Sequence, residues 1–70
     1  MKRQTVKSSN IKSIGYKLNQ KILEVEFISG SIYQYFNVPE KIFNELMQAK
    51  SKGKYFIGNI RKVYMFKKEK

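Results

Sequence analysis

Two segments in the first half of the chain alternate apolar and polar residues with the period of a β-strand. Residues 11–18 read IKSIGYKL and residues 22–28 read ILEVEFI, and in both segments apolar side chains recur at alternate positions. Such alternation is typical of strands with one buried face. A two-residue loop at Asn19-Gln20 would place Ile14 opposite Val25, so that the apolar sets of both strands face the same side. The pattern therefore predicts a β-hairpin.

A third strand is predicted over residues 31–36, SIYQYF, and its register depends on the length of the preceding loop. A two-residue turn at Ser29-Gly30 would turn Tyr33 and Tyr35 to the outer face of the sheet. There they would form an aromatic pair of the kind that stacks nucleic-acid bases. A three-residue loop at residues 28–30 shifts the pairing by one residue, which moves every side chain to the other face.

Polarity distinguishes the two registers of this third strand. The two-residue turn buries Gln34 and places both tyrosines beside glutamates, whereas the three-residue loop turns the tyrosines to the core and exposes Ile32 and Phe36. A buried amide without a partner costs about 1–3 kcal/mol, while an apolar residue outside costs little. We therefore favour the three-residue loop, with Tyr33 and Tyr35 on the core face and their hydroxyls near its rim.

The period of the pattern changes to that of an α-helix after Val38-Pro39. Proline ends the sheet and suits the first turn of a helix, which we expect to begin near Glu40. Its apolar stripe comprises Ile42, Phe43, Leu46, Met47 and Ala49. A second, shorter helix is expected after Ser51, which can serve as its N-cap. Residues 63–66 favour an extended segment.

These elements predict an α+β fold in which a three-stranded antiparallel β-meander is followed by two short helices packed on one face. Seventy residues are enough for one domain, so we expect a single domain over residues 1–70. Its ordered core is predicted at about residues 6–66, with frayed basic termini.

Charge is the main compositional feature of the chain. Fifteen Lys and Arg residues stand against five glutamates, which gives a formal net charge of +10. Residues 8–66 alone carry nine basic and four acidic residues, so the body keeps a charge of +5. A basic body fits a polyanion, with RNA or DNA ahead of membrane headgroups. A lysine-rich composition of AT-rich coding origin explains the same charge equally well. The body has a single arginine, Arg61, which weakens the case for evolved phosphate recognition.

Several spaced elements follow one another in order along residues 6–64. They are Val6, Ser8-Ser9, Ile11, Gly15-Tyr16, Leu23-x-Val25-x-Phe27, Gly30, Tyr33-x-Tyr35, Val38-Pro39, Ala49-x-Ser51-x-Gly53-x-Tyr55-Phe56 and Ile60-Arg61. Together they resemble the KTSC domain, a small family named for its occurrence at the C-terminus of some lysyl-tRNA synthetases. The chain departs from the family at Ile57, where the family commonly has an asparagine. The resemblance, through the synthetase association, suggests RNA binding.

The residue types present argue against an enzyme and against a metal site. The chain contains neither cysteine nor histidine, so it lacks the usual zinc ligands and a histidine base for Ser8-Ser9. Glu24 and Glu26 alternate with core residues, which we interpret as a solvated polar face rather than an acid–base pair. We therefore expect no catalysis, no cofactor and no metal.

One stretch has the composition of an anion site. If Ser51 caps the second helix, the free N–H groups of that helix point outward among lysines, with a glycine beside them. Arg61 could reach the same region. The simpler interpretation is a helix–helix turn that carries lysines. The candidate nucleic-acid contacts are Lys50, Ser51, Lys52, Gly53, Lys54 and Arg61, with Tyr33 and Tyr35 as possible aromatic contacts.

Two functions remain open on the sequence alone. The first is a small basic module that binds nucleic acid, with RNA preferred. The second is a protein–protein adaptor that docks through the sheet, its edge or the exposed Ile32 and Phe36. The N-terminus has no apolar segment of the secretory type and no apolar run is long enough to span a membrane, so we expect a cytoplasmic protein without a membrane partner.

Overall fold

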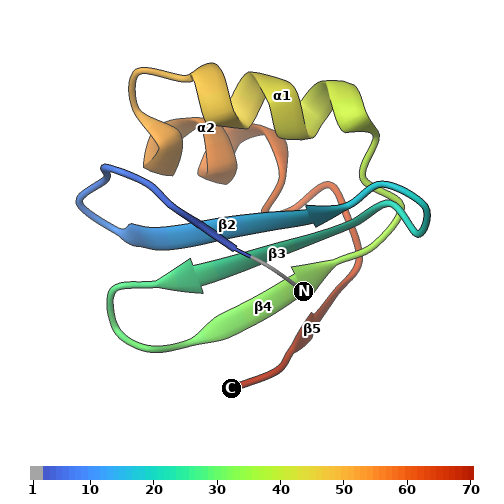
Figure 1. Cartoon of the computed structure of the whole chain (residues 1–70), viewed down its shortest axis with the longest axis horizontal. Helices are drawn as coiled ribbons and strands as arrows, with labels where there is room; N and C mark the ends of the chain where they lie inside the picture. The colour runs from blue at the N-terminus through green and yellow to red at the C-terminus, as the bar shows by residue number, and fades with distance from the viewer. Residues whose placement is uncertain (1–2) are drawn as a thin grey trace.

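An antiparallel sheet covered on one face by two helices forms the computed structural model, which describes residues 3–70 (Figure 1). The helices are α1, Glu40–Gln48, and α2, Lys52–Asn59. Five strands run in the order β1-β2-β3-β4-β5 across the described residues. Their bounds are Gln4–Thr5 for β1, Ile11–Lys17 for β2, Ile22–Phe27 for β3, Ile32–Tyr35 for β4 and Phe66–Lys68 for β5.

The α+β class is confirmed, and the prediction of three strands was wrong. The two additional strands are short edge strands from the terminal segments, where β1 pairs with β2 and β5 pairs with β4. The sheet thereby extends beyond the core of residues 6–66 that the pattern predicts. Two or three residues are too few to show a period of two, and their pairing is set by the neighbouring strand rather than by their own propensity.

The register of both hairpins agrees with the prediction. Ile14 pairs with Val25 across β2 and β3, and Val25 pairs with Tyr33 across β3 and β4. The N–H of Gly30 donates to the Phe27 carbonyl at 2.9 Å, which closes the three-residue loop, and Gly30 adopts a φ of 100°. That backbone conformation strongly favours glycine. One residue of loop length thus turns both tyrosines toward the helices.

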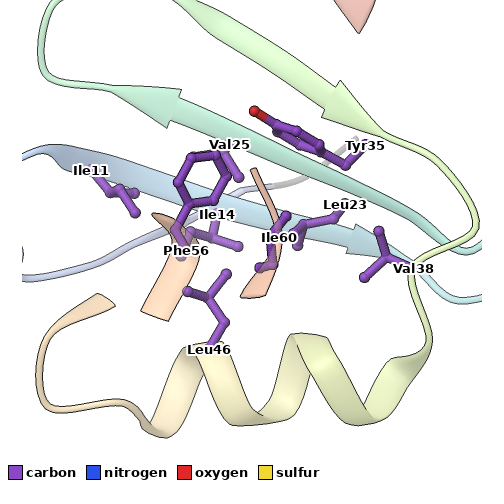
Figure 2. Close-up of a cluster of buried hydrophobic side chains, with 9 residues drawn as sticks. All are labelled: Ile11, Ile14, Leu23, Val25, Tyr35, Val38, Leu46, Phe56 and Ile60. Carbon is purple, nitrogen blue, oxygen red and sulfur yellow. The ribbon is translucent and has the colours of Figure 1, made fainter. Parts of the chain in front are cut away.

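The core lies between this face of the sheet and the two helices (Figure 2). Ser51 caps α2 as expected, with its Oγ accepting from the Lys54 N–H at 3.3 Å. The Tyr16 hydroxyl donates to the Val38 carbonyl, and the Tyr16 ring stacks on Phe43 of α1 at 4.8 Å between centroids. The buried apolar residues are Ile11, Ile14, Leu23, Val25, Tyr35, Val38, Leu46, Phe56 and Ile60.

The outer face of the sheet carries a polar network rather than a solvated row of side chains. The interpretation of Glu24 as solvated was wrong, because Glu24 is only 7% exposed. Arg3 pairs with Glu24, and Gln34 Nε2 donates to the same carboxylate at 2.9 Å. Ser13 Oγ donates to Glu26 at 2.7 Å, and this hydrogen bond chiefly holds the pKa of Glu26 below its usual value. The alternation of β3 gave no indication that Arg3 crosses this face.

Ile32 and Phe36, which the favoured register was expected to expose, are half-buried. The N–H of Phe36 donates to the Met65 carbonyl at 2.9 Å, and the Ile32 carbonyl accepts from Glu69 at 2.7 Å. The segment containing β5 therefore runs alongside both residues. Within residues 3–70, no helix has the length and apolar character needed to cross a membrane.

Candidate functional site: an aromatic groove

A hollow of about 730 Å³ opens on the helix-covered face, between α2 and the β4–β5 edge of the sheet. In Figure 1 both helices lie toward the β2 side, with β4 and β5 at the opposite edge of the sheet. Helix α2 therefore forms one wall of the hollow and the sheet forms the other. We call it the aromatic groove, since its lining includes the rings of Phe27, Tyr33, Tyr35, Phe56 and Phe66.

Contacts between neighbouring rings join the five rings into one continuous aromatic surface. Phe56 of α2 meets Phe27 and Tyr35 edge-on, at 5.4 and 5.3 Å between centroids. Figure 2 shows Phe56 and Tyr35 pointing toward one another across the core. Phe66 of β5 lies 5.6 Å from Tyr33 and 5.7 Å from Tyr35. These spacings are those of favourable aromatic pairs.

Exposure divides this surface into a buried part and an open part. Phe56 and Tyr35 belong to the core, whereas Phe66 is 56% exposed. Two further exposed apolar residues stand at the mouth of the groove, Ile57 on α2 and Ile28 at the β3–β4 loop. Each of these three residues comes from a different element. The groove therefore keeps apolar area in contact with water on three sides.

The two ends of the groove differ in chemistry. Ser9, Asn10, Ser29 and Ser31 line it at the loops that meet the N-terminal end of α2. Arg61 and Lys62 line it just beyond the C-terminal end of α2. No acidic residue is among the described residues that line the groove.

Local backbone bonds explain these placements. The Arg61 N–H donates to the Phe56 carbonyl at 2.9 Å, which turns the chain back over the helix end. The Ile28 N–H donates to the Asn10 carbonyl at 2.9 Å and so joins the two loops at the polar end. A Cβ on Gly53 would lie 3.3 Å from Asn10 Nδ2. The absence of a side chain at Gly53 thus lets the residue 8–10 loop approach α2 closely.

The phenolic oxygens of Tyr33 and Tyr35, two of the residues that line the groove, keep some contact with solvent. Neither oxygen is part of a side-chain hydrogen bond among the described residues. In that part of the chain, every fully buried side-chain oxygen or nitrogen has a hydrogen-bond partner. Because these two phenolic oxygens have none, they are not fully buried. Burial of the ring, with the neighbouring Tyr33 as a smaller contribution, raises the pKa of Tyr35 to about 12, and the charge of Arg61 acts in the opposite direction.

The raised pKa of Tyr35 predicts a loss of stability at alkaline pH. Tyrosine in the unfolded chain ionises near pH 10, whereas folded Tyr35 keeps its proton to about pH 12. The native state therefore binds more protons in this interval, and the free energy of unfolding falls as pH rises through it. The difference in phenolate absorbance between the wild type and Tyr35→Phe, followed as pH is raised, should show a transition near pH 12. A difference transition near pH 10 would contradict the effect of ring burial on the pKa of Tyr35.

The structure separates the residues that the sequence offered as a site. Tyr33, Tyr35, Gly53 and Arg61 all line the groove. The lysines of the α1–α2 turn do not line it: Lys50 and Lys54 are exposed, and Lys52 Nζ donates to the Ala49 carbonyl at 3.2 Å. Ser51 is occupied as the cap of α2.

Sequence reasoning missed Phe66, Lys62 and Asn10 as lining residues. Phe66 joins the site because it pairs with Tyr35 across β4 and β5. The sequence predicted an extended segment over residues 63–66, but it gave no indication of this pairing. Ile57, noted as a departure from the family pattern, lies at the groove mouth. The spacing of Gly53 and Ile57 by four residues is the signal that could have placed these two on one face of α2. Arg61 lies beyond the end of that helix.

Comparison with known proteins agrees with this fold. The model of the KTSC domain family matches residues 7–64. A crystal structure of a KTSC domain protein from Yersinia pestis is 43% identical and superimposes with a TM-score of 0.91, covering 96% of this chain and 94% of that one. An uncharacterized protein of Stutzerimonas stutzeri is 46% identical over 56 residues, which is 80% of this chain and 79% of that protein. A lysine–tRNA ligase of Nostoc punctiforme is 40% identical over 58 residues, 83% of this chain but 10% of the ligase.

The fold is that of a small α+β domain, in which two helices pack on one face of an antiparallel β-meander. The chain belongs to the KTSC domain family.

Proposed function

We propose that this protein is a small, basic, non-catalytic module that binds nucleic acid, with RNA preferred over DNA. The observation that carries the proposal is the aromatic groove, in which exposed ring area lies beside Arg61 and Lys62. Single-stranded nucleic acids are bound by this combination, because bases stack on aromatic faces while cations neutralise the backbone.

The charge of the whole chain supports the same proposal. A net charge of +10 attracts a polyanion before contact is made. The groove itself offers two cations and no carboxylate among its described lining residues. A phosphate group that enters the groove therefore meets no negatively charged side chain among these lining residues.

The preference for RNA is supported by context. Similar segments occur in proteins named lysine–tRNA ligases, in Nostoc punctiforme and in Nostoc sp. strain PCC 7120. A domain carried by such an enzyme is well placed to contact RNA, although the present chain matches only about a tenth of each ligase. A cytoplasmic location is part of the proposal for the same reason.

The salt dependence of RNA binding tests the proposal. Affinity for a single-stranded RNA should fall steeply as salt rises, with a log–log slope of about −0.7 for each phosphate neutralised. Arg61→Ala should make this slope shallower, while Lys41→Ala removes an equal charge from α1, outside the groove. Fluorescence anisotropy at several salt concentrations measures both. A flat response to salt, or no binding at low salt, would refute the proposal.

The lysines of the α1–α2 turn give a second comparison within this experiment. Replacing Lys50, Lys52 and Lys54 together removes three charges outside the groove lining. We expect weaker binding to every RNA sequence without a change in sequence preference, because phosphate contacts are shared by all sequences. Unchanged affinity in the triple variant would remove this turn from the interface.

A protein–protein adaptor is the second candidate, favoured by the exposed Val63 and Met65 beside Phe66. Docking by strand addition is less favourable, since the edge strand β5 carries Lys67 and Lys68 and such lysines protect sheet edges. An adaptor predicts association that is insensitive to salt. A strict monomer in sedimentation, together with steep salt dependence of RNA binding, would rule this candidate out.

A further inference from the structure

We propose that the aromatic groove holds one unpaired base of a single-stranded RNA between Ile57 and Phe66, with the adjoining phosphate on Arg61 and Lys62. This inference rests on the proposed function and specifies what enters the groove.

The apolar walls of the groove indicate a flat ligand. Ile57 on α2 is 52% exposed and Phe66 on β5 is 56% exposed, and both line the same hollow from different walls. Large apolar side chains that stay in contact with water on the two walls of one groove are suited to cover the two faces of a planar ring. Bases taken out of a stack are held in this way, between aromatic and apolar side chains.

The polarity of the groove gives the ligand a direction. The groove runs along α2, whose eight residues extend for about 12 Å at 1.5 Å per residue. One end offers neutral groups, Ser31 and Asn10 among them, and the other end offers Arg61 and Lys62. A ligand that matches both ends has a hydrogen-bonding edge at one side and an anion at the other. A nucleotide has this arrangement, with a base edge opposite its phosphate.

The polar end is built to hold its groups in place. The Asn10 carbonyl accepts from Ile28, and the Asn10 N–H donates to Ser8 Oγ at 3.3 Å. These bonds fix the Asn10 backbone while its side-chain amide is exposed at the groove. An amide offers both a donor and an acceptor, which is what the edge of a base requires. Tyr33 and Tyr35 also line the groove and carry further polar groups, their phenolic hydroxyls.

The groove is large enough to admit an unpaired nucleotide. A volume of about 730 Å³ lies within the range of about 300–1,000 Å³ that encloses one small ligand. The bases of a duplex are stacked on one another inside the helix and cannot enter it. RNA modules that read bases select single strands for this reason. The groove should therefore distinguish a single strand from a duplex of the same sequence.

The test uses the full chain with a single-stranded RNA, the matching duplex and AMP as probes. We expect the single strand to bind at least about tenfold more tightly than the duplex, and Phe66→Ala to lose about tenfold or more of that affinity. Phe66→Tyr should retain it, because the stacking face is kept. Met65→Ala is the matched control, since Met65 is the exposed neighbour of Phe66 but does not line the groove. AMP should shift the NMR signals of Ile57 and Phe66, and ribose 5-phosphate should shift them less.

The possible outcomes separate this inference from the function on which it rests. Equal affinity for single strand and duplex, with Phe66→Ala unchanged, would overturn the base site while nucleic-acid binding stands. The same holds if AMP shifts residues outside the groove only. Absence of RNA binding at low salt would overturn both the base site and the proposed nucleic-acid binding. Unchanged far-ultraviolet circular dichroism of Phe66→Ala, together with retained binding by Phe66→Tyr, would assign the loss to the missing ring rather than to misfolding.

Discussion

Replacing Phe56 with alanine should lower the free energy of unfolding by about 3–5 kcal/mol, the usual cost of removing an enclosed aromatic ring. Phe56 is 4% exposed and packs edge-on against Phe27 and Tyr35. Its loss leaves a cavity where α2 meets the sheet. A domain of this length has a total stability of about 4–10 kcal/mol, so the variant should be partly or wholly unfolded at 25 °C. Urea unfolding followed by circular dichroism measures the loss.

Phe66→Ala is the control for this result, because it removes the same side chain from the same groove. Phe66 is more than half exposed, so its replacement should cost less than about 1 kcal/mol and leave the urea m-value unchanged. The two variants thus separate the floor of the groove, which stabilises the fold, from its open wall, which is free to contact a ligand. Equal losses of stability would mean that Phe66 belongs to the core, which would contradict its assignment as a stacking surface.

The register of the tyrosines shows what local sequence can determine. Residues 28–30 and the polarity of Gln34 were enough to place Tyr33 and Tyr35 on the core face, and the pairing of Val25 with Tyr33 agrees. The alternative, an exposed tyrosine pair on the outer face, fails because side chains in a strand have a strict period of two. Residues 40–48 and the Ser51 cap were predicted for a similar reason, since both depend on neighbours within one or two turns.

The groove itself could not be predicted in this way. Its exposed ring, Phe66, comes from a three-residue strand whose position depends on pairing with β4, about thirty residues earlier in the chain. Arg61 was singled out for its charge, but its distance from the tyrosines depends on the packing of α2. The lysines at 50–54 were the most conspicuous polar feature of the sequence, and the packing leaves them outside the groove lining. Sites assembled from distant segments require the tertiary structure, because no local periodicity records which faces will meet.

Arg3 illustrates the same dependence on distant contacts, and its replacement should have the second largest effect on stability. Arg3 lies one residue before β1, but it reaches across the outer face to pair with Glu24 of β3 and to donate to Ser13 Oγ at 3.1 Å. In Arg3→Ala the carboxylate of Glu24 stays almost enclosed without its cation. Removing one partner of a buried pair costs about 3–5 kcal/mol. We expect about 2 kcal/mol here, because the Arg3 side chain is 28% exposed and solvent screens part of the interaction.

Two further variants make the Arg3 prediction specific. Lys67→Ala breaks the pair between Lys67 and Glu69, which are 3.6 Å apart and largely exposed, and should cost less than about 1 kcal/mol. Adding Glu24→Gln to Arg3→Ala should recover part of the loss, because the buried charge is removed while the new amide oxygen can still accept from Gln34. Urea midpoints at neutral pH measure all three. If Arg3→Ala costs no more than Lys67→Ala, or if Glu24→Gln recovers nothing, the network on the outer face does not stabilise the fold as its contacts predict.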